Sequence, residues 1–192
     1  MRRINALACE KGIAMHLDGA RLFNASVASG VPVRDYAVLF DSVSICLSKG
    51  LGAPVGSMVA GERDFIERCR RYRKLFGGGM RQVGLLAAAG IYALENNIDR
   101  LAEDHRNARQ FAERVGRIEG IDIELETVQT NIVVMDIAGL GLDPSRVVNK
   151  LKDNGLLVVV FGATKIRAVT HLDVTSREVL RAAEILEETF GA

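Results

Sequence analysis

Residues 41–54 read Asp-Ser-Val-Ser-Ile-Cys-Leu-Ser-Lys-Gly-Leu-Gly-Ala-Pro, and they join an apolar, β-branched run to a glycine-rich turn. The run from Asp41 to Ser48 predicts a strand, and the glycines and proline predict that the chain turns sharply after it. Lys49 is the first residue of this turn. The sequence therefore places a lysine directly at the end of a strand.

A second strand end lies upstream of this turn. The short apolar segment 13–17 predicts a buried strand that runs into His-Leu-Asp-Gly-Ala-Arg at residues 16–21. Open α/β sheets bind their ligands at the carboxyl ends of strands, and here polar groups gather at such an end. If the two strands are neighbours, Asp18 and Lys49 lie at the same edge of the sheet.

The remaining elements favour an α/β fold followed by a smaller α+β unit. Helices are predicted for residues 2–11, 62–74, 82–97, 98–118, 144–154 and 176–190, and further strands for 55–60, 121–125, 131–137, 156–161 and 165–170. The Ala-rich helix 82–97 has the composition of a buried helix. Because the elements become shorter after Gly120, we expect one domain over residues 1–119 and a small domain over residues 120–192.

The composition of the chain argues against nucleic acid and membranes as binding partners. The chain has 25 Lys plus Arg against 24 Asp plus Glu, so no net field favours nucleic acid or an anionic membrane. No apolar stretch approaches the roughly 20 residues that a membrane span needs. The three cysteines lack CxxC spacing, which argues against a disulfide framework or a zinc cluster and favours a reduced, cytoplasmic compartment.

Lys49 is the residue with the most evident chemistry. Burial in a turn would disfavour its charged form, and a neutral amine is the nucleophile that condenses with an aldehyde. The neighbouring glycines would let a flat ring approach the backbone closely. The alternative is a lysine in a surface turn, where the glycines serve only the turn.

Asp18 has an equally open interpretation. Its carboxylate could pair with a protonated pyridine nitrogen, or it could form an Asx-turn or N-cap ahead of the following helix. Arg21 could bind a carboxylate or phosphate, or face solvent. His16 shares a strand face with Asp18, although a lone histidine there is more often structural.

Two further regions carry candidate cations. Arg81 follows Gly77-Gly78-Gly79-Met80, where backbone amides and a guanidinium could cradle a phosphate, whereas Lys74 belongs to a basic run that is mostly a solvated helix face. Arg167 lies within the predicted strand 165–170, where a charge is costly unless it is paired or at an edge. It could bind a substrate carboxylate or occupy an exposed edge strand.

Four segments together resemble the low-specificity L-threonine aldolase family. They are His-Leu-Asp-Gly-Ala-Arg-Leu-Phe-Asn-Ala from residue 16, Ser-Lys-Gly-Leu-Gly-Ala-Pro-Val-Gly-Ser from residue 48, Gly-Gly-Gly-Met-Arg-Gln from residue 77, and Arg-Ala-Val-Thr-His-Leu-Asp-Val from residue 167. They occur in order along nearly the whole chain. The resemblance implies the fold of pyridoxal-phosphate transferases of the aspartate-aminotransferase type, with a large cofactor domain and a small C-terminal domain.

The resemblance also implies roles for individual residues. Lys49 matches the lysine that forms the Schiff base with pyridoxal 5′-phosphate, and Asp18 matches the partner of the pyridine nitrogen. Arg21 matches a residue close to ring and substrate, and Arg167 the arginine that binds the substrate carboxylate. Arg81 and Lys74 match basic residues near the site, which a neighbouring subunit could share.

The implied activity is retro-aldol cleavage of L-threonine or L-allo-threonine to glycine and acetaldehyde. The resemblance covers the C-terminal portion of the family, so the phosphate-binding loop and the ring-stacking histidine are expected in a preceding half. A homodimer or homotetramer is expected. Two alternatives are β-elimination from an aromatic amino acid on the same scaffold, and a catalytically silent chain that acts only as an assembly partner.

Overall fold

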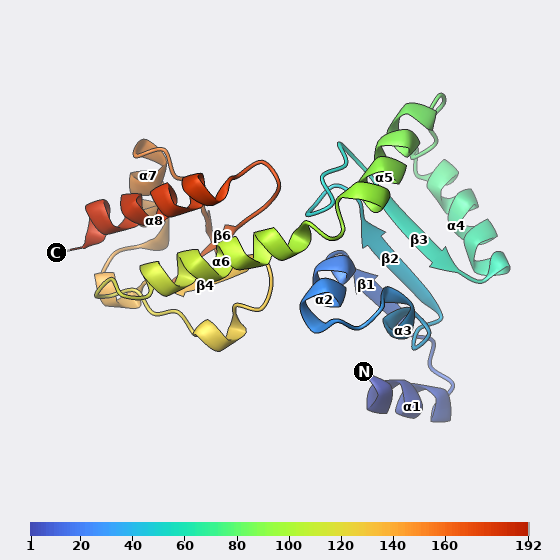
Figure 1. Cartoon of the computed structure of the whole chain (residues 1–192). Helices are drawn as coiled ribbons and strands as arrows, with labels where there is room; N and C mark the ends of the chain where they lie inside the picture. The colour runs from blue at the N-terminus through green and yellow to red at the C-terminus, as the bar shows by residue number, and fades with distance from the viewer. Residues whose placement is uncertain (192) are drawn as a thin grey trace. The chain divides into compact units, whose positions relative to one another are not determined.

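A computed structural model describes residues 1–191 of the chain and divides it into two compact units, Met1–Asp99 and the part that begins at Arg100 (Figure 1). No helix among these residues has the length and apolar character to cross a membrane. The two units are described separately.

The first unit is built on a three-stranded sheet in the order β1-β2-β3. The strands are β1 (His16–Gly19), β2 (Ser42–Cys46) and β3 (Ser57–Gly61), with β1 parallel and β3 antiparallel to β2. Its helices are α1 (Arg2–Glu10), α2 (Leu22–Ser29), α3 (Val33–Ala37), α4 (Arg63–Leu75) and α5 (Gly84–Asn96). The connection from β1 to its parallel neighbour β2 contains α2 and α3, as parallel pairing requires a crossover.

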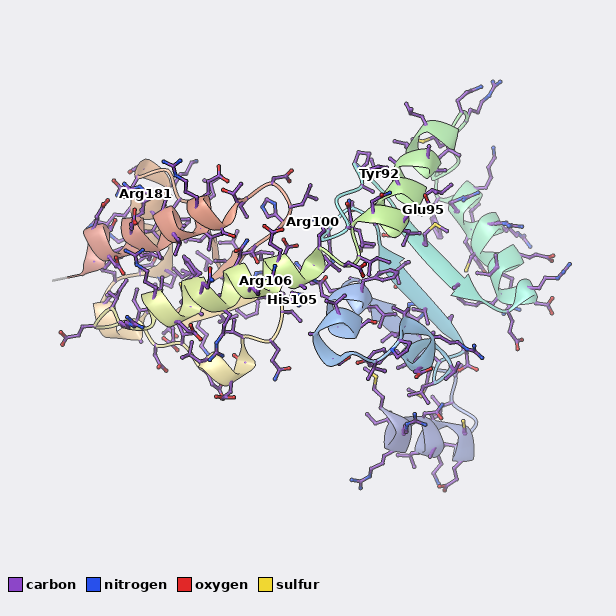
Figure 2. The ribbon with its side chains drawn as sticks, in the orientation of Figure 1. Tyr92, Glu95, Arg100, His105, Arg106 and Arg181 are labelled. Atoms are coloured by element: carbon purple, nitrogen blue, oxygen red, sulfur yellow. The ribbon has the colours of Figure 1, made fainter. Side chains whose placement is uncertain are left out.

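Two expectations about burial in this unit are wrong. The strand before Asp18 is not buried: it begins at His16 rather than residue 13, and only Gly19 is fully covered. Helix α5 has only Gly90 and Ala93 buried, while Leu85 is 82% exposed and Tyr92 is 63% exposed. Figure 2 labels Tyr92 on this helix. An apolar composition predicts a covered helix, but within the described chain nothing covers most of α5.

The second unit is an antiparallel sheet in the order β4-β6-β5 packed against helices (Figure 1). The strands are β4 (Ile132–Asp136), β5 (Val159–Val160) and β6 (Lys165–Val169), and the helices are α6 (Leu101–Val115), α7 (Pro144–Asp153) and α8 (Ser176–Phe190). Met135, Ile166 and Leu186 are fully buried between the sheet and the helices. This unit therefore has its own hydrophobic core.

The predicted strand 121–125 is the clearest error in this unit. Asp122 forms a single bridge with Asp136, and a 3-10 helix, Leu125–Thr127, follows directly. Asp136 is the last residue of β4, so the segment meets the sheet only where the neighbouring strand ends. The predicted strand 156–161 is likewise reduced to Val159–Val160.

The division into compact units falls twenty residues before the predicted domain boundary, because helix α6 packs with the second unit. Its residues Ala108, Phe111 and Val115 are buried in the core that also contains α8 and β6. The domain boundary near residue 119 stays a prediction.

Candidate active site

Asp18 and Lys49 lie at the carboxyl ends of neighbouring strands. Parallel pairing of β1 with β2 sets Asp18 opposite Ser44, and Lys49 follows the last residue of β2, Cys46, by three positions. The carboxyl ends of parallel strands meet at one edge of a sheet, which is the usual location of ligands in open α/β folds. The structure thus meets the condition that the two strands are neighbours, and the chemical roles of the two side chains stay predictions.

The backbone around Lys49 is held by hydrogen bonds within its own loop. The Gly52 amide donates to the Lys49 carbonyl at 2.9 Å, and the Ala53 amide donates to the Leu47 carbonyl at the same distance. Gly52 has φ of +72°, a left-handed conformation that strongly favours glycine. Leu51 is buried beneath the turn, so the loop that presents Lys49 is anchored rather than free.

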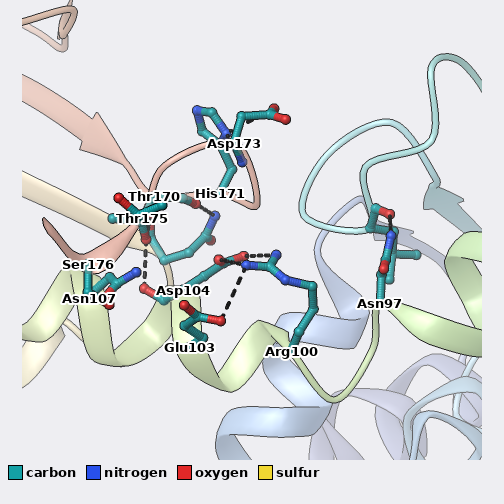
Figure 3. Close-up of polar contacts among 12 residues, drawn as sticks. Asn97, Arg100, Glu103, Asp104, Asn107, Thr170, His171, Asp173, Thr175 and Ser176 are labelled. Carbon is teal, nitrogen blue, oxygen red and sulfur yellow. Dashed lines mark hydrogen bonds and ion pairs between the residues drawn. The ribbon is translucent and has the colours of Figure 1, made fainter. Parts of the chain in front are cut away.

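One residue that fixes this turn was missed by sequence reasoning. Asn97, directly after α5, donates from its side-chain amide to the Leu51 carbonyl at 2.7 Å (Figure 3). The two residues are 46 positions apart, so no local motif could have revealed the contact. Asn97 thereby ties the end of α5 to the lysine turn.

The expected burial of Lys49 is wrong for this chain. Its side chain is exposed in the structure, so the surrounding residues do not bury the amine. Hydrogen bonds order the turn, but residues 1–191 do not cover the Lys49 amine.

The conformation of Asp18 agrees with the Asx-turn that the sequence left open as one of two interpretations, and the pairing with a ring nitrogen stays a prediction. One carboxylate oxygen accepts a hydrogen bond from the Ala20 amide at 3.2 Å, which is an Asx-turn. The residue is exposed at the sheet edge, so the same carboxylate can still face a ligand. A side chain at Gly19 would approach the Ser44 carbonyl to 2.7 Å, so β1 and β2 are this close only because residue 19 is glycine.

His16 has a structural explanation. Its Nδ1 lies 2.8 Å from the Ser42 hydroxyl and its Nε2 lies 3.3 Å from the Ser44 hydroxyl. Both ring nitrogens are thus engaged by β2, and the histidine links the two strands on the face that also carries Asp18. This favours the structural interpretation of His16.

The other candidate cations of the first unit, Arg21, Lys74 and Arg81, do not form a phosphate-binding site in the structure. Arg21 is half-buried just before α2, whereas Lys74 and Arg81 are exposed. The expectation of a cradle made by glycine amides is partly wrong, because Gly78 donates to the Arg73 carbonyl at 2.8 Å and Gly77 to the Lys74 carbonyl at 3.2 Å. These amides close the end of α4 and are not available to a phosphate.

Arg167 lies on the central strand of the second sheet, so the edge-strand alternative is wrong. Its register partners are Val134 on β4 and Val159 on β5. Ile166 beside it points into the core and is fully buried, so Arg167 projects from the opposite face. Among residues 1–191 its side chain makes no hydrogen bond or ion pair, and its Nε is buried without an acceptor. Its guanidinium lies over the Phe161 ring, 5.1 Å from the centroid.

A buried polar cluster surrounds Thr170, the residue directly after β6 (Figure 3). The Thr170 hydroxyl donates to the Asp104 carbonyl at 2.7 Å, and the Asn131 amide donates to the Thr170 carbonyl at 2.8 Å. The Asp104 carboxylate is fully buried and accepts hydrogen bonds from Arg100. Burial raises the pKa of Asp104 more than the Arg100 charge lowers it. The cluster joins the residue before β4 and the residue after β6 to the first turn of α6.

The chain belongs to the Beta-eliminating lyase family, which matches residues 1–138. It is also similar to individual members over nearly its whole length. It is 43% identical over 178 residues to Low-specificity L-threonine aldolase 1 of Arabidopsis thaliana, covering 92% of this chain and 50% of that protein. It is 44% identical over 174 residues to Low specificity L-threonine aldolase of Escherichia coli K12, covering 91% and 50%.

The chain spans about half the length of these relatives. A solved structure of Leishmania major threonine aldolase has the same fold, with a TM-score of 0.71, 20% identity, and coverage of 96% of this chain and 54% of that one. The expected α/β fold of the threonine aldolase type is confirmed.

Proposed function

We propose that this chain carries the cofactor-anchoring and carboxylate-binding residues of a pyridoxal-phosphate-dependent threonine aldolase. The observation that carries the proposal is the placement of Asp18 and Lys49 at the carboxyl ends of adjacent parallel strands. Membership of the Beta-eliminating lyase family and similarity to threonine aldolases support it.

The residues at this edge fit pyridoxal phosphate. The cofactor needs a primary amine for its aldehyde and a carboxylate for its ring nitrogen, and Lys49 and Asp18 are of these two kinds. The Ala20 amide orients the Asp18 carboxylate, and the hydrogen bonds of the 47–53 loop orient Lys49. When bound, pyridoxal phosphate supplies a conjugated ring that accepts the electron pair of a breaking bond.

Each candidate residue has a separate task in this proposal. Lys49 holds the cofactor through its amine, and Asp18 keeps a proton on the ring nitrogen by accepting its hydrogen bond. Arg21 and Arg81 contribute positive charge towards cofactor or substrate, and Lys74 contributes to substrate binding from the basic helix α4. Arg167 binds the substrate carboxylate, because its buried, unpaired Nε is costly until an anion arrives.

The proposed reaction is the cleavage of L-threonine or L-allo-threonine. The β-hydroxyl loses its proton, the bond between Cα and Cβ breaks, and Cα gains a proton, so the products are glycine and acetaldehyde. The task of Arg167 is to orient the substrate through its carboxylate, since the orientation of the amino acid decides which bond at Cα is cleaved.

Borohydride trapping tests the anchoring role directly. The purified chain is incubated with pyridoxal phosphate, reduced with borohydride and digested, and the modified peptide is identified by mass spectrometry. We expect the modification on Lys49 in the wild-type chain and in Lys11→Ala, which removes another exposed lysine, and its loss in Lys49→Ala. Labelling that is spread over several exposed lysines, or unchanged in Lys49→Ala, contradicts the proposal.

An aromatic amino-acid β-elimination is the alternative on the same scaffold. Side-by-side assays with threonine and tyrosine separate the two reactions, since only the first releases acetaldehyde. No observation in the structure favours tyrosine, whereas the relatives cited above are named as threonine aldolases.

We further propose that the chain assembles into a homodimer or homotetramer. Phe76, directly after α4, and Leu85, Ile91 and Tyr92 on α5 are all exposed, and large exposed apolar surfaces often mark protein–protein contacts. The same surface supports the alternative of a silent assembly partner. Uptake of cofactor at Lys49 argues against that alternative, and light scattering of the purified chain measures the oligomer.

The three free cysteines support the proposed reduced, cytoplasmic compartment.

A further inference from the structure

We propose that Phe161 is a positioning residue that holds the Arg167 guanidinium flat and aims its nitrogens at a carboxylate. This inference rests on the proposed function, because it concerns how the substrate carboxylate is bound. It assigns a role to an aromatic residue in a hairpin loop, outside the four segments that resemble threonine aldolases.

The Phe161 ring is the contact that the structure gives to the Arg167 charge. The guanidinium carbon lies 5.1 Å from the ring centroid, within the range of a cation–π interaction. An aromatic ring covers the face of a guanidinium and leaves its edge, where the N–H groups project, open to a planar anion. The ring contact therefore restricts the arginine without using any of its hydrogen-bond donors.

The backbone holds Phe161 in place for this contact. Its amide donates to the Lys165 carbonyl at 2.8 Å, which closes the hairpin between β5 and β6. Gly162 follows with φ of +103°, so the tight turn depends on glycine. Because the hairpin returns the chain to β6, Phe161 and Arg167 face each other although they are six positions apart in the sequence.

The residues around Arg167 explain why a positioning contact from Phe161 should strengthen carboxylate binding. Val134 and Val159 flank it in register and offer no acceptor. A long side chain without a fixed partner loses rotational freedom when it binds a ligand, and this loss weakens binding. A ring that confines the guanidinium beforehand reduces that loss, so Phe161 should strengthen carboxylate binding without contacting the carboxylate.

Acetate binding to the purified chain tests the inference. The ¹H–¹⁵N signal of the Arg167 Nε group, assigned by its disappearance in Arg167→Lys, is followed while sodium acetate is added, with sodium chloride at equal ionic strength as the control. In the wild-type chain we expect a saturable shift with acetate only. Phe161→Leu should move the starting signal, because the ring current is lost, and should weaken acetate binding about two- to five-fold, the size of an exposed cation–π contact.

Phe161→Tyr is the matched control, because it keeps the ring face and should bind acetate like the wild type. Equal thermal unfolding of the variants separates positioning from folding, and if Phe161→Leu unfolds, Phe161→Met replaces it. The inference is overturned if the leucine or methionine variant binds acetate as tightly as the wild type, if the tyrosine variant is equally weakened, or if the wild-type signal ignores acetate.

The acetate result would remain valid if the proposed enzymatic function proved wrong. Borohydride trapping at Lys49 does not involve Phe161, so failure of trapping in the wild-type chain counts against the enzyme and leaves the acetate result standing. In a preparation that cleaves threonine, Phe161→Leu should raise KM by the same factor and leave kcat unchanged. A fall in kcat at constant KM would contradict a positioning role.

Discussion

The side-chain amide of Asn97 and the backbone carbonyl of Leu51 are joined by a hydrogen bond of 2.7 Å (Figure 3). This bond connects the end of α5 to the turn that presents Lys49. The carbonyl belongs to a residue whose side chain is almost fully buried, so losing its donor leaves a poorly solvated acceptor. The position of the candidate anchoring lysine therefore depends on a residue far away in the sequence.

Asn97→Ala should loosen the lysine turn. We expect the free energy of unfolding to fall by about 1 kcal/mol, a typical value for a lost hydrogen bond, and the labelling of Lys49 by pyridoxal phosphate and borohydride to become slower. Asn96→Ala is the control, because within the described part of the chain the Asn96 side-chain amide donates to the Tyr92 carbonyl of its own helix and to no other residue. Equal labelling rates in the two variants would show that the Asn97 contact does not hold the turn.

Asp18→Asn should keep the Asx-turn but remove the proposed charged partner of the ring nitrogen. An asparagine oxygen can still accept from the Ala20 amide, so stability should be unchanged, but a neutral amide cannot hold a proton on a ring nitrogen. We expect cofactor retention on dialysis to weaken by about ten- to a hundred-fold, the worth of a charge-assisted hydrogen bond. Unaltered retention, measured by absorbance, would remove Asp18 from the site.

Gly19→Ala tests the close approach of β1 and β2. The added Cβ would lie 2.7 Å from the Ser44 carbonyl and 3.2 Å from the Leu22 Cβ, and a backbone atom cannot yield as a flexible side chain can. We expect a destabilisation of about 1–3 kcal/mol, as for overpacking elsewhere. Gly84→Ala is the control, since its Cβ would meet open space. Urea unfolding curves that coincide for the two variants would contradict this packing.

Asp104→Asn should change how stability depends on pH. Because burial raises the pKa of Asp104 in the folded chain, folding favours its protonated form, and this contribution to stability is lost as pH rises from the ordinary aspartate pKa through the raised one. An asparagine has no such dependence. We expect the variant to gain stability relative to the wild type between pH 4 and pH 7.

Denaturant unfolding of the wild type and of Asp104→Asn, at pH 4 and at pH 7, measures this difference in stability. The comparison cancels the opposite contribution of carboxylates such as Glu178, whose pKa is lowered by hydrogen bonds from the Thr175 backbone and hydroxyl. A difference between variant and wild type that is constant, or that falls with pH, would show that the Arg100 charge dominates over burial at Asp104.

Local patterns predicted most helices and the chemistry at two strand ends. The periodicity of residues 62–74 and 176–190 and the glycine turn after Lys49 are signals that act over a few residues, and the structure has α4, α8 and the turn where they predict them. The segment 121–125 shows the limit of such signals, because an apolar alternation forms a strand only where a partner strand continues.

The sequence by itself determined which residue types stand at the candidate site, Lys49 in a glycine turn and Asp18 before a tight turn, because turn chemistry depends on the residues themselves. Only the tertiary structure decided that β1 and β2 are parallel neighbours, that Arg167 is on a central strand over Phe161, and that Asn97 holds the lysine turn. These relationships join segments that are distant along the chain. They arise from the packing of whole elements, which no short stretch of sequence encodes.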